Sequence, residues 1–188
     1  MEERKRLSGV TLIEMMVTVS IVAFMSFLAI PSVGLWIDDL RSKALANSLL
    51  VDLNLARSEA IRRGHPVVAC IAVGSACHPI GRWEQGWLLF ADINNNALRD
   101  TGEEVIRQTK IESHGWRLWG NGPVRSYVSY HPLGQTRLVN GAFQAGTLTI
   151  CLPSRPNALS RRIIINSRGR PRIERVDQAI AGCDLSGR

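Results

Sequence analysis

Residues 8–14 read Ser-Gly-Val-Thr-Leu-Ile-Glu, and the apolar run that starts at Val10 continues to Ile30. As a helix that rises about 1.5 Å per residue, this run is roughly 30 Å long, the thickness of the apolar core of a bilayer. Its one charged side chain is Glu14, near its start. A carboxylate in hydrocarbon is costly unless it is paired, so it usually marks a function. The run therefore predicts a membrane helix with a functional acidic residue.

The segment before this run distinguishes an anchor from a secretory signal peptide. Arg4-Lys5-Arg6 precedes the run, and such a basic segment stays in the cytoplasm by the positive-inside rule. A signal peptide would end in a small-residue cleavage site of the A-x-A kind, and none follows the run. The small residue, Gly9, lies before it. Cleavage after Gly9 would remove the basic leader and keep the apolar helix.

The motif S-G-V-T-L-I-E resembles the prepilin-peptidase site of type IV pilins and of type II secretion pseudopilins. The resemblance implies cleavage after Gly9, methylation of Val10 as the new N-terminus, and pairing of Glu14 with the terminal ammonium of a neighbouring subunit. Valine replaces the phenylalanine usual at the first mature position, and Pro31 matches the kink proline of many pilins. Prepilin peptidase and other major and minor pilins are the implied partners. The alternative is a single-span anchor whose Glu14 reaches the lipid headgroups.

Composition limits the class of function. The chain of 188 residues has a formal charge of +7, which favours polyanions or anionic surfaces as partners. The four histidines show no ligand spacing, and no Ser-His-Asp pattern, phosphate loop or catalytic carboxylate pair occurs. We therefore expect a protein that is not an enzyme and that needs no cofactor or metal. Four tryptophans are expected to pack in the core or on hairpins rather than to stack on bases: Trp83, Trp87, Trp116 and Trp119.

After Pro31 the chain becomes amphipathic. Apolar residues recur at steps of three and four, as on one face of a helix that covers a sheet: Leu45, Leu49, Leu53, Ala56 and Ala60. Gly64 is a natural C-cap for this helix. A bend is expected near Pro31 and Gly34.

Short β-like segments, separated by Gly, Asn and Pro, follow from residue 65 onward. The predicted strands are Pro66–Ala72, Gly86–Asp92, Val105–Thr109, Val124–Tyr130, Thr147–Leu152, Arg161–Asn166 and Pro171–Arg175. The fold class is α+β and pilin-like, with a long N-terminal helix, transmembrane and then amphipathic, packed on an antiparallel β-sheet head. We divide the chain into a leader (1–9), a transmembrane and assembly helix (10–34), the amphipathic helix of the head (35–64), and a β-rich head with a basic C-terminal hairpin and tail (65–188).

The segment G-W-L-L-F-A-D-I-N-N-N-A-L-R-D-T-G-E-E-V-I-R, residues 86–107, resembles a hairpin of GspH/FimT-type minor pilins and pseudopilins. It also places side chains at positions 1, 3, 5, 7, 9 and 12 of an EF-hand loop: Asp92, Asn94, Asn96, Leu98, Asp100 and Glu103. Ala97 stands where such a loop needs glycine, and its flanks are predicted strands rather than helices. A polar hairpin is therefore favoured over a calcium site, which stays an open alternative.

The cysteines are expected to form disulfides, because the predicted head lies in the periplasm. None of the four sits in a C-x-x-C pair, which argues against a zinc ribbon. Three pairings are possible. Local closure and stapling of the tail favour Cys70–Cys77 and Cys151–Cys183.

A basic turn near the C-terminus carries the functional prediction. Arg168, Arg170 and Arg172 flank Gly169 between two predicted strands, and Arg161 and Arg162 begin the first of them. Guanidinium groups bind phosphate in a forked geometry, and a glycine lets the backbone approach closely. Arg155 and Arg175 would widen the patch if the strands lie side by side. The alternative is a solvated hairpin tip.

Gly169-Arg170-Pro171-Arg172 resembles the C-terminal G-R-x-R motif of FimT-type minor pilins, which bind DNA during natural transformation. The resemblance implies that Arg170 and Arg172 are the primary DNA contacts. We thus expect a minor pilin anchored by a single pass in the inner membrane, with its head in the periplasm, incorporated into a pilus at the cell surface, and binding DNA with little sequence preference. The alternatives are a GspH-like type II secretion pseudopilin, an assembly-priming minor pilin without DNA binding, and a calcium-stabilised adhesin head.

Overall fold

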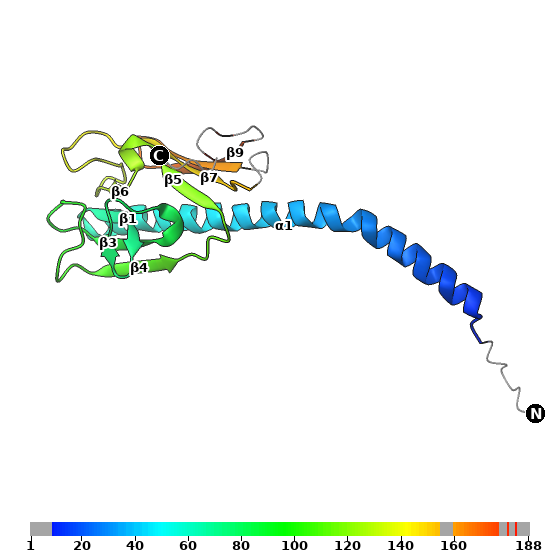
Figure 1. Cartoon of the computed structure of the whole chain (residues 1–188). Helices are drawn as coiled ribbons and strands as arrows, with labels where there is room; N and C mark the ends of the chain where they lie inside the picture. The colour runs from blue at the N-terminus through cyan, green and yellow to red at the C-terminus, as the bar shows by residue number, and fades with distance from the viewer. Residues whose placement is uncertain (1–8, 155–159, 177–179, 181–182, 184–188) are drawn as a thin grey trace, which may run out of the picture. The chain divides into compact units, whose positions relative to one another are not determined.

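The computed structural model describes residues 9–154, 160–176, 180 and 183, apart from the side chains of residues 27–32 (Figure 1). The chain divides after Asp38 into two units. Residues 1–8 of the predicted leader lie outside the described part.

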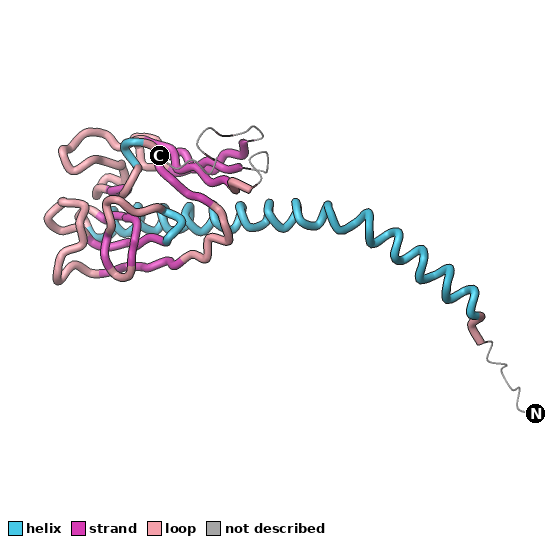
Figure 2. The backbone as a smooth tube through the Cα atoms, viewed as in Figure 1, coloured by secondary structure: helices cyan, strands magenta, loops and turns pink. Residues whose placement is uncertain are grey.

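A single helix, α1 (Leu12–Arg63), runs from the first unit into the second (Figure 2). At its start, the Thr11 hydroxyl oxygen accepts a hydrogen bond from the backbone N–H of Glu14, as an N-cap does. At its end, Gly64 has φ +73° and donates its N–H to the carbonyl of Ala60, so its predicted role as C-cap is confirmed. Within the described residues, no helix combines the length and apolarity that crossing a membrane requires.

The second half of α1 lies in the core of the head. Leu49, Leu53, Ala56 and Ala60 are fully buried, as predicted, while Leu45 is only partly buried. These residues form one apolar cluster with side chains from two separate β-sheets. The helix therefore provides the surface on which both sheets pack.

The first sheet contains β1 (Val67–Val73), β2 (Ala76–Cys77), β3 (Gly86–Ala91), β4 (Val105–Lys110) and β6 (Tyr127–Tyr130). Its order is β2-β1-β3-β4, with β6 also paired to β1, and all these pairs are antiparallel. Six of the seven residues of β1 are buried. One face of β1 meets the main core, and the other joins a second apolar cluster with Leu88 and Phe90.

The second sheet is antiparallel, with the order β5-β7-β8-β9. Its strands are β5 (Arg117–Gly120), β7 (Gly146–Cys151), β8 (Ser160–Ile165) and β9 (Pro171–Val176). Leu118, Ile150 and Ile163 turn inward and complete the main core. The β8–β9 hairpin at the edge of this sheet carries the predicted basic turn with Arg168, Gly169 and Arg170, called the arginine turn below.

Most predicted strands are present, with ends shifted by a residue or two. The predicted strand Val124–Tyr130 was too long, because Gly122–Val124 forms a 3-10 helix, η2, and β6 starts at Tyr127. Strands β2 and β5 were not predicted. Trp83, Trp87 and Trp116 are buried, as expected, whereas Trp119 is only half-buried.

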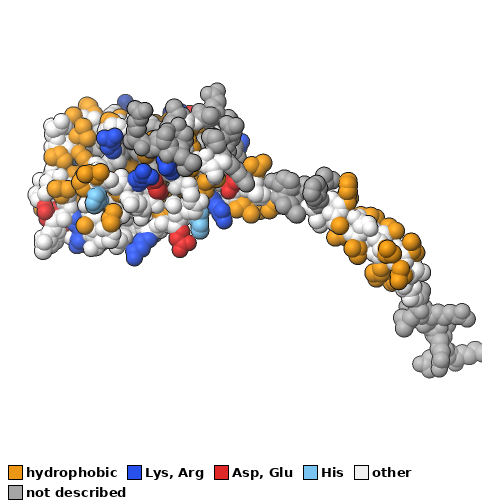
Figure 3. Space-filling view, viewed as in Figure 1, with side chains coloured by type: hydrophobic (Ala, Val, Ile, Leu, Met, Phe, Trp, Pro, Cys, Tyr) orange, Lys and Arg blue, Asp and Glu red, His pale blue; other side chains and the backbone are white. Residues whose placement is uncertain are grey.

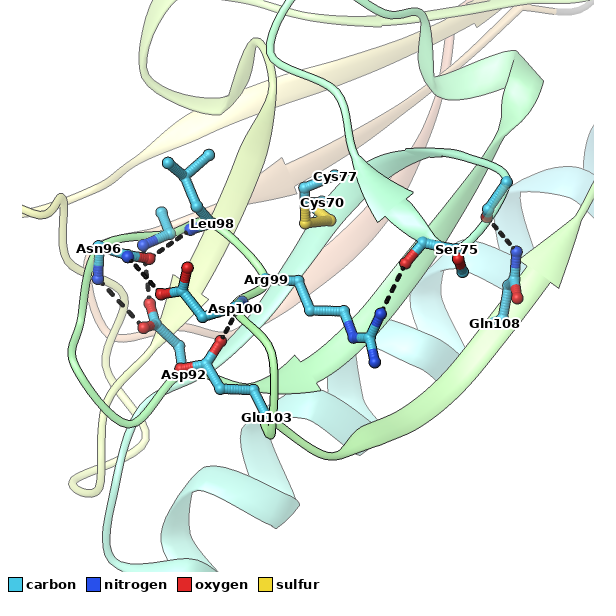
Figure 4. The surroundings of a disulfide bond; sticks show 12 residues. Cys70, Ser75, Cys77, Asp92, Asn96, Leu98, Arg99, Asp100, Glu103 and Gln108 are labelled. Carbon is cyan, nitrogen blue, oxygen red and sulfur yellow. Dashed lines mark hydrogen bonds between the residues drawn. A yellow bond between two sulfur atoms is a disulfide. The ribbon is translucent and has the colours of Figure 1, made fainter.

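Two disulfides join the four cysteines. Cys70–Cys77 links β1 to β2 (Figure 4). Cys151–Cys183 links the end of β7 to the C-terminal segment. These are the two pairs that the sequence favoured.

Candidate nucleic-acid interface

The β8–β9 turn is a tight turn closed by Asn166. The backbone N–H of Gly169 donates to the carbonyl of Asn166 over 2.8 Å, and the N–H of Arg170 donates to the Asn166 side-chain oxygen over 3.1 Å. Gly169 adopts φ +72°, a conformation that favours glycine. Arg168 and Arg170 are exposed on this turn. The turn therefore holds two guanidinium-bearing residues on a backbone that is fixed by its own hydrogen bonds.

Gly169 serves a different purpose from the one predicted. It is buried, and a Cβ atom at this position would lie 2.2 Å from the carbonyl oxygen of Gly134. Gly134 closes a second turn by donating its N–H to the carbonyl of His131. The glycine thus allows two turns to pack backbone against backbone, rather than allowing a ligand to approach.

The register of the hairpin places Arg162 on the same face as Arg172. Arg162 pairs with Glu174, and Ile164 pairs with Arg172, so these four residues project to one side of the sheet. This side faces away from the core, because the alternate residue Ile163 is buried. The Arg172 side chain is 71% exposed, and its Nη2 lies 3.7 Å from the Glu174 carboxylate. The outer face of the hairpin is therefore basic, and Glu174 is the carboxylate beside Arg172 among the residues described there.

Arg161 projects to the opposite side, and its predicted place in the DNA surface is corrected. Its side chain is 5% exposed and donates to the Asp39 carboxylate over 2.6 Å and to the Ser42 hydroxyl. The Arg161 guanidinium, together with Lys43, holds the pKa of Asp39 below its usual value. Arg161 therefore joins β8 to α1 inside the head and is not available to a ligand.

Two outlying arginines, Arg155 and Arg175, were predicted to widen the patch. Arg175 is exposed but already has an interaction partner. Arg155 lies outside the described residues.

One basic residue next to the turn was missed by the sequence analysis. Arg57, on α1, donates from Nε to the carbonyl oxygen of Gly134 over 2.9 Å. This is the same oxygen against which Gly169 packs. No pattern in the sequence relates residue 57 to residues 134 and 169, because their proximity depends on how both turns dock on the helix.

The N-terminal motif can be described only from Gly9 onward. Gly9, Val10 and Glu14 are exposed, and Gly9 precedes the first helical residue. Apolar side chains line the surface of the first half of α1 (Figure 3). An exposed, non-helical Gly9 is compatible with access by a peptidase, although the roles of these three residues stay predictions.

The polar loop between β3 and β4 satisfies its own hydrogen bonds. The Asp92 carboxylate accepts the backbone N–H groups of Asn96 and Ala97, over 3.1 and 2.9 Å. The Glu103 carboxylate accepts those of Ile93 and Asp100, over 2.8 and 2.9 Å. Burial raises the pKa of Asp92.

The amide side chains of this loop complete the network around its third carboxylate. The side-chain amides of Asn94 and Asn96 both donate to Asp100, each over 2.7 Å. Figure 4 shows Asn96 beside Asp100. The backbone N–H of Leu98 donates to the Asn96 side chain over 2.7 Å. Among the described residues, no group of three or more His, Cys, Asp or Glu side chains is placed to hold a metal ion. The contacts are those of the polar hairpin that the sequence favoured.

Comparison with family models gives two matches. Residues 45–169 match the model for the type II transport protein GspH. Residues 4–30 match the prokaryotic N-terminal methylation motif. The first match covers most of the head and the second covers the apolar run, so together they span both parts of the chain.

A curated relative and two solved structures are similar along most of their length. The chain is 28% identical over 166 residues to the pilin-like protein PilA1 of Thermus thermophilus, covering 88% of this chain and 97% of that protein. It resembles the type IV minor pilin FimU of Pseudomonas aeruginosa in one crystal form with a TM-score of 0.55 and 18% identity, covering 75% of this chain and 98% of FimU. In a second crystal form the TM-score is 0.56 with 16% identity, covering 79% and 98%. These structures support a pilin fold.

Proposed function

We propose that this chain, which belongs to the GspH family of minor pilins and pseudopilins, structural components rather than enzymes, binds DNA through the β8–β9 turn. In this proposal the protein is a minor type IV pilin that captures DNA for uptake in natural transformation.

The observation that carries the proposal is the exposed arginine surface of the hairpin. Arg168 and Arg170 are exposed on the turn, and Arg172 and Arg162 follow on the outer face of β8–β9. Guanidinium groups bind phosphate oxygens in a forked geometry, and phosphate contacts carry no direct sequence information. Binding should therefore be strongly dependent on salt and nearly independent of DNA sequence.

A surface of three or four phosphate contacts gives weak binding per head. Useful capture would then need several copies along a fibre, or cooperation with other components, because linked sites bind far more tightly than single ones. A pilus that displays this head in several places would supply that multivalency.

The family also suggests where the protein acts. We propose that prepilin peptidase cleaves after Gly9 and that residues 10–34 anchor the chain in the inner membrane with the head in the periplasm. The Glu14 carboxylate would pair with the N-terminal ammonium of a neighbouring pilin, which would satisfy a charge in an apolar setting. Incorporation into a pilus would then bring the head to the cell surface.

A second candidate function uses the same fold without DNA. The family match over residues 45–169 supports a GspH-like pseudopilin, or a minor pilin that primes assembly, as well as it supports a DNA-binding pilin. The two candidates differ in the role of the arginine turn, which would be ordinary solvated surface in the second.

The test is an equilibrium titration of fluorescent duplex DNA with the full-length chain in a mild detergent. The key variant is Arg170→Ala/Arg172→Ala. The matched control is Arg82→Ala/Arg125→Ala, which removes the same charge from two exposed arginines outside the β8–β9 hairpin, one beside η1 (Trp83–Gln85) and one beside η2. Salt is varied between 50 and 300 mM, and all variants are first compared for thermal stability.

We expect wild type to bind in a salt-dependent manner. Each phosphate contact contributes about 0.9 to the slope of log K against log salt. The Arg170→Ala/Arg172→Ala variant should therefore show a slope smaller by about 2 and an affinity roughly thirtyfold lower at 0.15 M salt. The control should behave like wild type. Equal binding by wild type and both variants would favour the pseudopilin or assembly-priming function.

A further inference from the structure

Two turns, each with a buried glycine, pack against each other: the arginine turn with Gly169 and the turn at residues 131–134 with Gly134. Gly134 and Gly169 have φ values of +73° and +72°, and a Cβ atom at either position would be too close to a neighbour. At Gly169 that neighbour is the carbonyl oxygen of Gly134, at 2.2 Å. At Gly134 the neighbours are the Cδ1 atom of Ile61, at 2.9 Å, and the guanidinium of Arg57. The arginine turn is therefore packed on the second turn, which in turn is packed on α1.

Within the described residues, one hydrogen bond holds Arg57 at this junction. Its Nε donates to the Gly134 carbonyl over 2.9 Å, and a Cβ on Gly134 would lie 3.3 Å from its Nη2. The bond through Nε orients the planar guanidinium, and no residue that the structure describes accepts a hydrogen bond from Nη1 or Nη2. A forked pair of donors in a fixed orientation is the geometry that phosphate accepts.

The charge of Arg57 is not neutralised within the described part of the chain. No carboxylate there forms an ion pair with it, and its nitrogens are not among the buried polar atoms that lack a partner. Arg57 is half-buried, and none of its nitrogens is a buried atom without a partner, so the N–H groups that bond to nothing in the described part of the chain contact solvent. Several other arginines of the head do pair with carboxylates, among them Arg63, Arg107 and Arg161.

We infer that Arg57 is an additional phosphate-binding residue, supplied by α1, of the surface formed by the arginine turn. The inference rests on the proposed DNA binding and extends it, because it continues the phosphate path from the turn onto the helix. A DNA backbone that contacts Arg168 and Arg170 at the turn would meet the guanidinium of Arg57 beside them. The second turn, residues 131–134, holds both parts of the surface together.

The experiment uses the full-length chain in detergent and short fluorescent duplex DNA at several salt concentrations. The variants are Arg57→Gln, which removes the charge, and Arg57→Lys, which keeps it. Arg41→Gln is the matched control, because Arg41 is exposed on the same helix, about 24 Å away along its axis at 1.5 Å per residue. Thermal unfolding of each variant shows whether the head remains folded.

Arg57→Gln should lower affinity about fivefold at 0.15 M salt and reduce the slope of log K against log salt by about 1, as expected for one lost phosphate contact. Arg57→Lys should keep most of the slope, and Arg41→Gln should match wild type. If Arg57→Gln weakens binding with the slope unchanged, Arg57 only positions the turn and the inference is wrong.

Two further outcomes separate this inference from the proposed function. If Arg57→Gln binds like wild type while Arg170→Ala/Arg172→Ala loses binding, Arg57 is no contact and the proposed function stands. If wild type itself shows no salt-dependent binding, the proposed function fails and the inference fails with it.

Discussion

Arg161 and Arg162 are adjacent in the sequence but project to opposite faces of β8, so replacing each should affect a different property. The Arg161 side chain is 5% exposed and bonded to Asp39, which is 12% exposed. Removing one member of a buried ion pair typically costs about 3–5 kcal/mol, because the other charge stays buried. Lys43 also pairs with Asp39 over 2.6 Å and would remain. We therefore expect Arg161→Ala to lower the free energy of unfolding by about 3 kcal/mol, at the low end of that range.

Thermal unfolding, followed by tryptophan fluorescence, measures this effect. For a folded unit of the size of residues 39–188, about 3 kcal/mol corresponds to a fall of roughly 6–12 °C in Tm. Arg162→Ala should change Tm by less than about 2 °C, because Arg162 is half-buried on the outer face of the hairpin, away from the core, and surface substitutions usually stay within about 0.5 kcal/mol. At a temperature where both variants are folded, only Arg162→Ala should weaken DNA binding.

The opposite pattern would refute this reasoning. If Arg161→Ala unfolds within about 2 °C of wild type and loses DNA binding, then Arg161 is a surface contact, and the ion pair with Asp39 does not hold β8 on the helix.

Three further predictions concern stability. Gly169→Ala should destabilise the head more than Gly141→Ala does. Both glycines have positive φ, but only at Gly169 would the added Cβ meet the Gly134 carbonyl. Chemical denaturation of the two variants measures the difference in the free energy of unfolding. Acid should remove the stability that ionised Asp39 gives the head. Arg161 and then Lys43 lower the pKa of Asp39, so this stabilisation is complete above the usual pKa of 3.8 and is lost as the pH falls through the lower folded-state pKa. Urea unfolding between pH 6 and 2 would show the loss. Calcium at 5 mM should leave Tm unchanged relative to a chelator, because Asp92 already accepts two loop N–H groups; a rise of several degrees would support the calcium-stabilised adhesin instead.

Local patterns predicted the elements well. The three- and four-residue spacing of apolar side chains identified the helix face that carries Leu49 and Leu53, and Gly64 marked its end. Short β-like segments gave most strands, because alternation and turn residues act within a few positions. The pairing of Cys70 with Cys77 was also local, since the two residues close a short hairpin.

Features that depend on how distant segments meet were not predicted. The strands divide into two sheets that pack on one helix, and no short-range pattern records that division. The inward direction of Arg161 follows from the register of β8 against its neighbours. Gly169 looked like a site for ligand approach, but the backbone that approaches it belongs to Gly134, 35 positions earlier in the chain. Arg57 was overlooked for the same reason.

The central claim is that DNA contacts the arginines of the β8–β9 turn. The most direct measurement is a ¹⁵N–¹H correlation spectrum of the arginine Nε–Hε groups, recorded on the full-length chain in detergent with and without a short duplex. The account predicts that the signals of Arg168, Arg170 and Arg172 shift in a salt-dependent way, while the signal of the buried Arg161 stays in place. Shifts spread evenly over the exposed arginines, or confined to residues away from the turn, would contradict it.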